Sequence, residues 1–120
     1  MSLWADRTIH LFVNLVIFTL KKARAMDPSM FSKAVLRLGR IVATANAAEE
    51  LSNEDILMAL KRHQSGDWGE LDEHDRQENE SSLQNGRRVV SIYNAKNGTR
   101  FWVITEADRS STTVLLPQDY

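Results

Sequence analysis

Two runs of alternating side chains lie near the C-terminal end of the sequence, on either side of a short polar turn. In Val89–Asn94 and Phe101–Glu106 bulky residues occupy both alternating positions, which is typical of strands covered on one face and partly on the other. Asn97-Gly98 lies between the runs, and Asn-Gly in this setting is the strongest short signal for a β-hairpin. A third run, Thr112–Leu116, follows a second polar turn. The pattern therefore predicts a small antiparallel sheet of three strands.

A helical repeat precedes these strands. Ile56, Leu60 and His63 recur at the spacing of one helical face, and Ser52 has the form of an N-cap. We therefore expect a core helix over Asn53–Arg62.

A second helix is expected after Asp72, which can cap its first turn. It extends to about Asn85, where Gly86 is suited to the C-terminal position. Its sequence is almost entirely polar, and only Leu71 and Leu83 offer much apolar surface. We therefore expect this helix on the outside of the domain.

The stretch before the helices is compatible with two structures. Apolar residues in Phe31–Leu38 recur at helical spacing, whereas Leu36–Thr44 has the composition of a strand interrupted by Gly39. We favour a strand over Leu38–Ala43, followed by a short helix over Ala45–Leu51. The sheet then has three to four strands, and the fold class is α+β with two core helices.

The N-terminal part of the sequence is strongly apolar over Leu11–Leu20. This run is too short to cross a membrane, which takes about 20 apolar residues. Its positive charges, Lys21, Lys22 and Arg24, follow the run instead of preceding it as in a signal peptide. We expect an extra apolar helix that packs on the domain or, through residues 8–25, on a second copy. A leader that is not part of the natural protein and a weak membrane anchor are the alternatives.

Length and composition are those of one ordinary domain. The chain has 120 residues, of which 42% are apolar and 26% charged, so we expect a single domain over 30–120 and an extension over 1–29. The absence of cysteine excludes disulfides and thiolate metal sites, and fits a cytoplasmic protein. Because His10, His63 and His74 lie in separate segments without metal-ligand spacing, and the glycines are isolated, we expect no metal and no cofactor.

Charge is distributed unevenly along the chain. Residues 1–47 carry a net charge of +5, residues 48–80 of −8 and residues 81–120 of +2. The acidic block can bind a basic partner or imitate nucleic-acid phosphates, although charge runs are more often a solvated helix face. The candidate partner-binding residues are Asp67, Trp68, Glu70, Asp72, Asp75 and Glu78.

A polar turn between the second and third strands offers an alternative chemistry. Glu106 could act as a general base and Arg109 or Arg100 as a phosphate clamp, as in a small ribonuclease, with His63 as a further candidate; this requires the groups to converge in a cleft. The competing interpretation is that Asp108 and its neighbours only form turn hydrogen bonds, and that His63 is a core histidine. Under the first interpretation the catalytic candidates are His63, Glu106 and Arg109. The nucleic-acid candidates are Arg87, Arg88, Arg100 and Arg109, next to the aromatic side chains of Tyr93, Phe101 and Trp102.

Three phrases in the sequence resemble a known family when taken together. They are Arg62–Leu71 (RHQSGDWGEL), Glu78-Asn79-Glu80 and Trp102–Pro117 (WVITEADRSSTTVLLP). They are similar to a family of small bacterial proteins found on plasmids, phages and other mobile elements, some of which are called plasmid-related proteins or type I restriction endonuclease subunit M. The resemblance covers about 30–120 and implies a compact α+β domain in a mobile-element setting, without an activity or residue roles.

A methyltransferase activity is not expected despite the restriction-subunit name. A DNA methyltransferase needs a glycine-bearing loop for its methyl donor and an Asn/Asp-Pro-Pro-aromatic motif at the target base, and the sequence contains neither. We therefore expect a non-enzymatic accessory protein of a mobile element that binds a protein partner, such as a nucleic-acid-processing or host-defence enzyme, through its acidic helix. The alternative is a small, toxin-like RNA-binding or RNA-cleaving protein that uses Arg100, Glu106 and Arg109.

Overall fold

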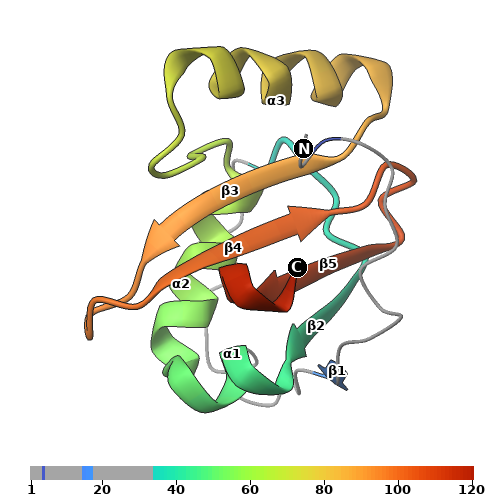
Figure 1. Ribbon diagram of the computed structural model, residues 1–120. Helices are drawn as coiled ribbons and strands as arrows, with labels where there is room; N and C mark the ends of the chain where they lie inside the picture. The colour runs from blue at the N-terminus through green and yellow to red at the C-terminus, as the bar shows by residue number, and fades with distance from the viewer. Residues whose placement is uncertain (1–3, 5–14, 18–33) are drawn as a thin grey trace.

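The computed structural model describes Trp4, Leu15–Ile17 and residues 34–120. These residues form one mixed sheet of five strands in the order β1-β2-β5-β4-β3, together with three α-helices (Figure 1). The strands are β1 (Leu15–Ile17), β2 (Arg40–Thr44), β3 (Val89–Asn94), β4 (Arg100–Thr105) and β5 (Ser111–Leu115). The helices are α1 (Ala45–Glu50), α2 (Asn53–Gln64) and α3 (Glu73–Asn85), and a 3-10 helix follows over Pro117–Asp119. The α+β class is confirmed.

The sheet is mixed, which corrects the prediction of a purely antiparallel sheet. β3, β4 and β5 are antiparallel neighbours as expected, with Asn94 opposite Arg100 across the hairpin. β2, however, pairs with β5 in the parallel direction, with Val42 opposite Thr113. A parallel pair needs a long crossover instead of a hairpin, and the chain between β2 and β5 contains every α-helix that the structure describes. The direction of β2 is therefore a property of the whole chain path.

The two predicted helices begin at their expected caps. The Ser52 hydroxyl accepts a hydrogen bond from the Asp55 backbone N–H (3.0 Å), and α2 continues to Gln64, two residues beyond the prediction. The Asp72 carboxylate accepts one from the Asp75 N–H (2.8 Å), and α3 ends at Gly86 in the left-handed conformation. Local capping chemistry thus sets both helices.

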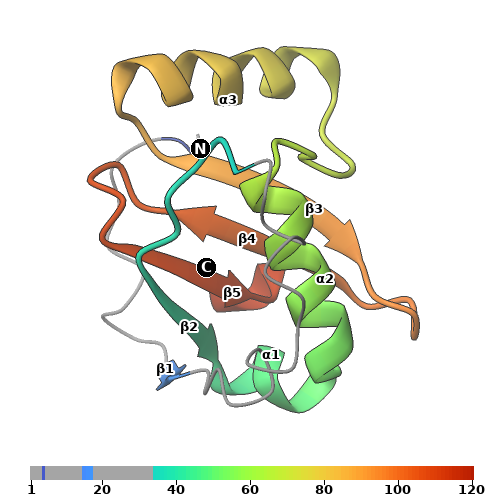
Figure 2. The ribbon, with the colours of Figure 1, turned by 180° about the vertical axis from the view of Figure 1, so that it is seen from behind.

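The main core lies between one face of the sheet and α2, which lies across that face, while α1 lies at the end of the sheet and contributes Ala47 (Figure 2). Ile56 and Leu60 of α2 are fully buried in it, together with Val103 of β4 and Val114 of β5. Burial of such aliphatic side chains stabilises the fold by about 1.5–3 kcal/mol each. Among the described helices, α2 therefore contributes the most apolar burial to the core.

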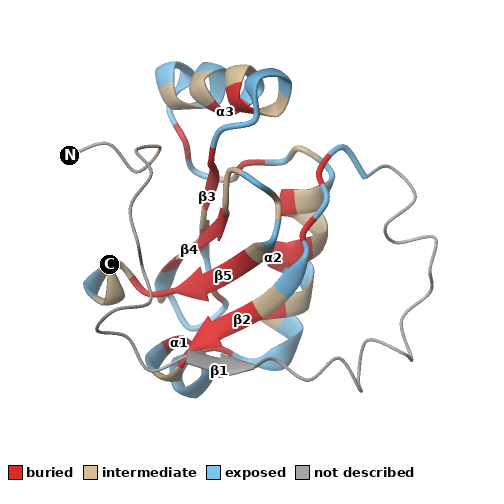
Figure 3. Cartoon of the chain, turned by 90° about the vertical axis from the view of Figure 1, so that its right-hand side faces the viewer, coloured by how far each residue is buried: buried red, intermediate tan, exposed pale blue. Residues whose placement is uncertain are grey.

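α3 is placed differently, beyond β3 at the edge of the sheet (Figure 3). Only Asn79 and Ser82 of this helix are buried, and both are polar. The expectation of a peripheral second helix is therefore correct for its position, whereas the description of it as a core helix is wrong.

The opposite face of the sheet carries a smaller cluster. Val90, Ile104 and Leu115 are fully buried there, with Trp102 and Tyr120 packed against them. Trp4 also packs on this cluster. The C-terminal 3-10 helix lies on this side, away from α2 (Figure 3).

The predicted N-terminal apolar helix falls mostly outside the described residues. Leu15–Ile17, which are described, form strand β1 antiparallel to β2 and not a helix. The candidate dimer contact over 8–25, apart from β1, and His10 lie outside the described residues. None of the helices in the described part of the chain has the length and apolar character that a membrane crossing requires.

Candidate functional site

The inner face of α3 closes the free edge of β3. Asn79, in the middle of α3, donates a hydrogen bond from its side-chain Nδ2 to the Val90 carbonyl oxygen (2.7 Å) and accepts one at Oδ1 from the Val90 N–H (3.0 Å). A carboxamide has the same donor and acceptor as a peptide group. Asn79 therefore pairs with β3 as one residue of a neighbouring strand would. The indole N–H of Trp4 also donates to Asn79 Oδ1 (2.8 Å).

The connection between α2 and α3 closes the next part of the same edge. The Ile92 N–H donates to the Trp68 carbonyl (3.2 Å), and the Glu70 N–H donates to the Ile92 carbonyl (2.8 Å). Gly69 lies between these two contacts with φ of +75°, and an added Cβ would lie 1.9 Å from the Ile92 oxygen. Only glycine fits here. An edge strand that could attract other chains is thus covered.

Trp68 is part of the core and not of the surface. Its side chain is 6% exposed, its indole N–H donates to the Glu80 carboxylate (3.1 Å), and its ring meets the His63 ring edge-on at 5.8 Å. The sequence placed Trp68 among the partner-binding residues because it lies in a polar, glycine-rich connection. The structure instead makes it the link between α3 and the core.

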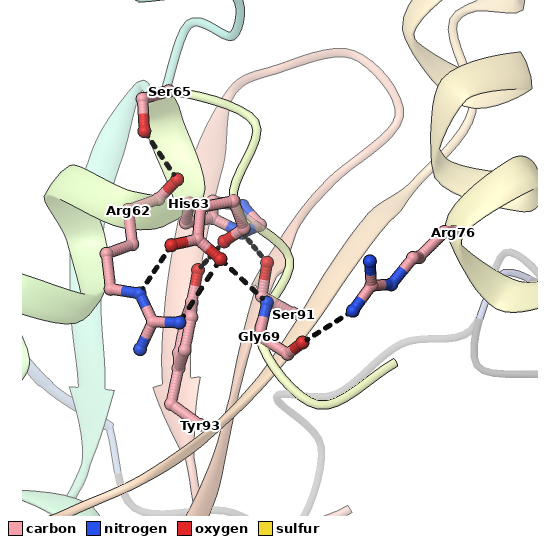
Figure 4. Close-up of polar contacts among 8 residues, drawn as sticks. Arg62, His63, Ser65, Gly69, Arg76, Ser91 and Tyr93 are labelled. Carbon is pink, nitrogen blue, oxygen red and sulfur yellow. Dashed lines mark hydrogen bonds and ion pairs between the residues drawn. The ribbon is translucent and has the colours of Figure 1, made fainter. Parts of the chain in front are cut away.

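Asp67, another partner-binding candidate, is bonded to neighbouring groups of Arg62, Gly69 and Tyr93, which are labelled in Figure 4. Its carboxylate accepts from Arg62 Nε (2.7 Å) and from the Gly69 N–H (3.2 Å), and its carbonyl accepts from the Tyr93 hydroxyl (2.6 Å). The bond from Arg62 is the main reason that the pKa of Asp67 lies below its ordinary value. Asp67 therefore shapes the connection, although its side chain is half-exposed.

His63 is fully buried within a line of hydroxyl groups. Its Nδ1 lies 2.6 Å from Ser91 Oγ and its Nε2 lies 2.9 Å from Thr105 Oγ1. Thr105 Oγ1 lies 2.7 Å from Thr112 Oγ1, which donates to the Leu38 carbonyl (2.7 Å). Each hydroxyl has one proton, so Thr105 donates to Thr112 and must accept from His63. His63 is consequently the Nε2–H tautomer, and Ser91 donates to its Nδ1.

This environment removes His63 from the catalytic candidates. Burial, and secondarily the positive charge of Arg109, lowers the pKa of His63 to about 3. A neutral ring without solvent exposure, with both nitrogens already bonded, cannot reach a proton on an external substrate. The core interpretation is the one that the geometry supports.

Arg109 holds the C-terminal end of α3. Its Nη2 donates to the Ser82 carbonyl in the last turns of the helix (2.9 Å), and its Nη1 donates to the carbonyls of Arg87 (2.6 Å) and Glu106 (3.1 Å). A cation at a helix C-terminus is favourable because it meets the last carbonyls and the negative end of the helix dipole. The predicted phosphate clamp is thus a cap supplied by a distant turn.

The other basic candidates do not gather with Arg109 into a groove. The Arg88 side chain is 1% exposed and pairs with the Glu106 carboxylate (2.8 Å). Arg87 is exposed, and Arg100 is exposed at the far end of β4. Arg100 and Glu106 are six positions apart along an extended strand, which corresponds to roughly 20 Å. Arg100, Glu106 and Arg109 therefore cannot act on one scissile bond in this arrangement.

The hollow at the turn after β4 does not unite these groups either. It has a volume of about 260 Å³ and is lined by Glu106, Ala107, Asp108 and Ser110. Asp108 accepts hydrogen bonds within the turn, including one from the Ser110 N–H (2.9 Å), and its bonding to Ser110 lowers its pKa. These are the turn contacts that the competing interpretation predicted.

The aromatic candidates for base stacking lie on two faces of the sheet. Tyr93 and Phe101 are buried in the main core towards α2, whereas Trp102 is half-buried on the opposite face, edge-on to Tyr120 at 5.7 Å. A stacking surface needs neighbouring exposed rings. These three side chains do not supply one.

The acidic residues at the start of α3 remain available for binding. They form what we call the acidic patch, which consists of Glu70, Asp72, Glu73, Asp75 and Glu78. The first three are exposed and the last two half-buried. His74 joins this surface through a contact from its Nδ1 to the Asp75 carboxylate (3.2 Å), which raises the pKa of His74.

Sequence reasoning missed the roles of Asn79 and Arg109. The available signal for Asn79 was its position: Asn79, Ser82 and Leu83 share one face of the helix at spacings of three and four. In a helix with so few apolar residues, that face was the one to bury. For Arg109 the sequence offered no comparable signal.

Comparison with known proteins gives no identification. No protein-family model, no curated protein and no solved structure matches the chain.

Proposed function

We propose that this protein is a non-enzymatic accessory protein that binds a basic surface of a protein partner through the acidic patch on α3. One observation carries the proposal: polar groups such as Asn79 and Glu80 fasten α3 to the domain, while Glu70, Asp72 and Glu73 at its start are exposed. A peripheral helix with almost no apolar contact is useful as a fixed support for charge. Complementary charge favours specific and rapid association with a basic partner.

The positions of the candidate catalytic groups favour binding over catalysis. His63 is buried and bonded at both nitrogens, and Arg109 is bonded to three backbone carbonyls. The RNA-cleaving alternative needs these groups to meet Glu106 in one open groove, and no described hollow brings them together.

The family resemblance supports the setting of the proposal. The three phrases that carry it each supply one of the contacts that hold α3: Trp68 in the first, Asn79 in the second and Arg109 in the third. A mobile element needs proteins that act on host defence or nucleic-acid-processing enzymes. Such enzymes present basic surfaces to nucleic acid, and these surfaces are suitable targets for the acidic patch.

The test removes the charge of the patch without removing the helix. The variant Asp72→Asn/Asp75→Asn/Glu78→Gln loses three negative charges, and asparagine keeps the N-cap at position 72. The control, Glu49→Gln/Glu50→Gln/Glu54→Gln, loses the same charge from exposed positions at α1 and the start of α2. Tagged proteins are expressed in bacterial cells, co-purified proteins are identified by mass spectrometry, and affinities are measured with the purified partner.

We expect the patch variant to bind at least tenfold more weakly than the parent, and the control to bind within twofold of it. The difference in affinity between the parent and the patch variant should decrease as salt is added, because exposed charges are screened. The proposal fails if the patch variant keeps the affinity of the parent, or if the control variant loses as much.

A further inference from the structure

The backbone of Arg109 is held in a conformation that most residues avoid. Its φ of 62° is in the left-handed region, and Arg109 is the non-glycine residue with a positive φ in the described part of the chain. A Cβ atom makes this conformation costly, and glycine would adopt it without that cost. The arginine side chain must therefore contribute something that glycine cannot.

The guanidinium joins three segments that meet at the end of α3. It donates to the carbonyls of Ser82 in the helix, of Arg87 in the loop before β3, and of Glu106 in its own turn. The Ser82 carbonyl also accepts from the Gly86 and Arg87 N–H groups. These three acceptors are backbone groups, so the contacts depend on how the segments lie and not on a neighbouring charge.

The position of α3 depends on few other contacts. Asn79 forms two hydrogen bonds with β3, Glu80 accepts one from the Trp68 indole N–H, and Arg76 donates to the carbonyls of Leu71 and Gly69 in the connection before the helix. Leu83 is half-buried, and the hydroxyl of buried Ser82 has no hydrogen-bond partner among the described residues. A helix with so little apolar burial can shift locally while the rest of the domain stays folded.

We propose that Arg109 is a positioning residue for the acidic patch. Through its side chain the turn between β4 and β5 sets the orientation of α3 and thereby the affinity for a basic partner. This inference depends on the proposed function. It makes the turn over Glu106–Ser110 a second place at which binding is controlled, distant in sequence from the patch itself.

The test uses charge-matched variants and a defined probe. Arg109→Gln and Arg100→Gln each remove one positive charge, Arg109→Gly also relieves the backbone, and Arg109→Lys keeps the charge but not the fork of donors. The probe is a stapled helical peptide with lysines on one face, compared with a peptide of the same composition in which the lysines are scattered around the helix. Amide hydrogen exchange of α3 and of β4 is measured alongside.

We expect Arg109→Gln and Arg109→Gly to speed exchange of the α3 amides at least tenfold and to leave β4 unchanged. Both should lower the affinity for the peptide with lysines on one face at least threefold and lower the affinity for the scattered peptide less. Arg109→Lys should have an intermediate effect. Loss of a positive charge should by itself strengthen binding of a cationic peptide, as we expect for Arg100→Gln. Weaker peptide binding by Arg109→Gln would therefore be opposite to the effect of the lost charge and would indicate a change in the orientation of α3.

Two results would overturn the inference. One is α3 exchange in Arg109→Gly equal to that of the parent, and the other is binding of the one-faced peptide to Arg109→Gln that is unchanged or tighter. The failure of the proposed function looks different. In that case neutralising Asp72, Asp75 and Glu78 leaves peptide binding intact, whereas α3 exchange still depends on Arg109.

Discussion

Acidification should destabilise this domain through His63 before its carboxylates protonate. The ring is buried with both nitrogens in hydrogen bonds, so the folded state accepts only the neutral form. Burial and the charge of Arg109 lower the pKa of His63 to about 3, whereas the ordinary histidine value is 6.5. Between these two values the unfolded chain binds a proton at this position and the folded chain does not.

The sign and size of the effect follow from proton linkage. Because the unfolded state binds more protons, the free energy of unfolding falls as the pH falls below about 6.5. One bound proton corresponds to roughly 1.4 kcal/mol per pH unit, so His63 alone should remove about 3 kcal/mol by pH 4. Domains of this size have about 5–15 kcal/mol in total. The loss is therefore large enough to measure well above the noise of denaturation curves.

Other titrating groups can be separated by pH window. The lowered pKa values of Asp67 and Asp108, due mainly to Arg62 and Ser110, contribute stability that is lost below their ordinary value of 3.8. His74 has a raised pKa, so any contribution from it is present at low pH and lost as the pH rises. The window from pH 6.5 to 4.5 therefore isolates a loss that only His63 explains among these groups.

The assay is urea denaturation at several pH values in that window, for the parent and two variants. His63→Gln should be less stable than the parent at pH 7 but should show little dependence on pH. His74→Gln, the exposed control, should keep at least the slope of the parent. Nitrogen-15 NMR of the parent should show His63 as the Nε2–H tautomer, without titration down to pH 4.5. A folded-state pKa near 6.5, or equal slopes for the parent and His63→Gln, would contradict this role of His63.

Two further substitutions test the closed edge of β3 by urea denaturation. Asn79→Leu removes both hydrogen bonds to Val90 and should lower the free energy of unfolding by about 3 kcal/mol, because two buried backbone groups lose their partner. The exposed control Gln77→Leu should change it by no more than about 0.5 kcal/mol. An equal effect of the two substitutions would contradict the strand-like role of Asn79. Gly69→Ala places a Cβ 1.9 Å from a carbonyl of β3 and should cost well over about 2 kcal/mol. Gly98→Ala, also at positive φ but in open space, should cost only about 1 kcal/mol, and similar values for the two glycines would argue against the close approach at Gly69.

The local parts of this fold could be predicted from the sequence. The Asn97-Gly98 hairpin and the caps at Ser52 and Asp72 are encoded within a few residues, and each lies where the pattern indicated. The parallel pairing of β2 with β5 joins residues about seventy positions apart, and no local signal encodes that direction. The edge position of α3 depends in the same way on a partner, Val90, that lies eleven residues from Asn79 and on another element.

The candidate site was predicted unevenly for a related reason. The charge of the acidic patch is visible in the sequence, and Glu70, Asp72 and Glu73 are exposed in the structure. Burial of Trp68 and the bonds of Arg109 were not visible, because both residues lie in polar segments whose environment is decided by tertiary contacts. Reactive side-chain types in a turn do not indicate reactivity until their hydrogen-bond partners are known.

Trp68 contacts both the buried His63 and helix α3. Its ring edge meets His63 at 5.8 Å, and its indole N–H donates to Glu80 on α3. Trp68 therefore packs against the buried His63 and also forms one of the hydrogen bonds that position α3. Apolar burial supplies most of the stability with which a helix packs on a domain, whereas hydrogen bonds depend on the direction between donor and acceptor and add about 0.5–1.5 kcal/mol each. A helix that presents charge to a partner needs the second property more than the first. This explains why α3 is attached by an amide, an indole and a guanidinium while the apolar side chains of α2 stabilise the domain.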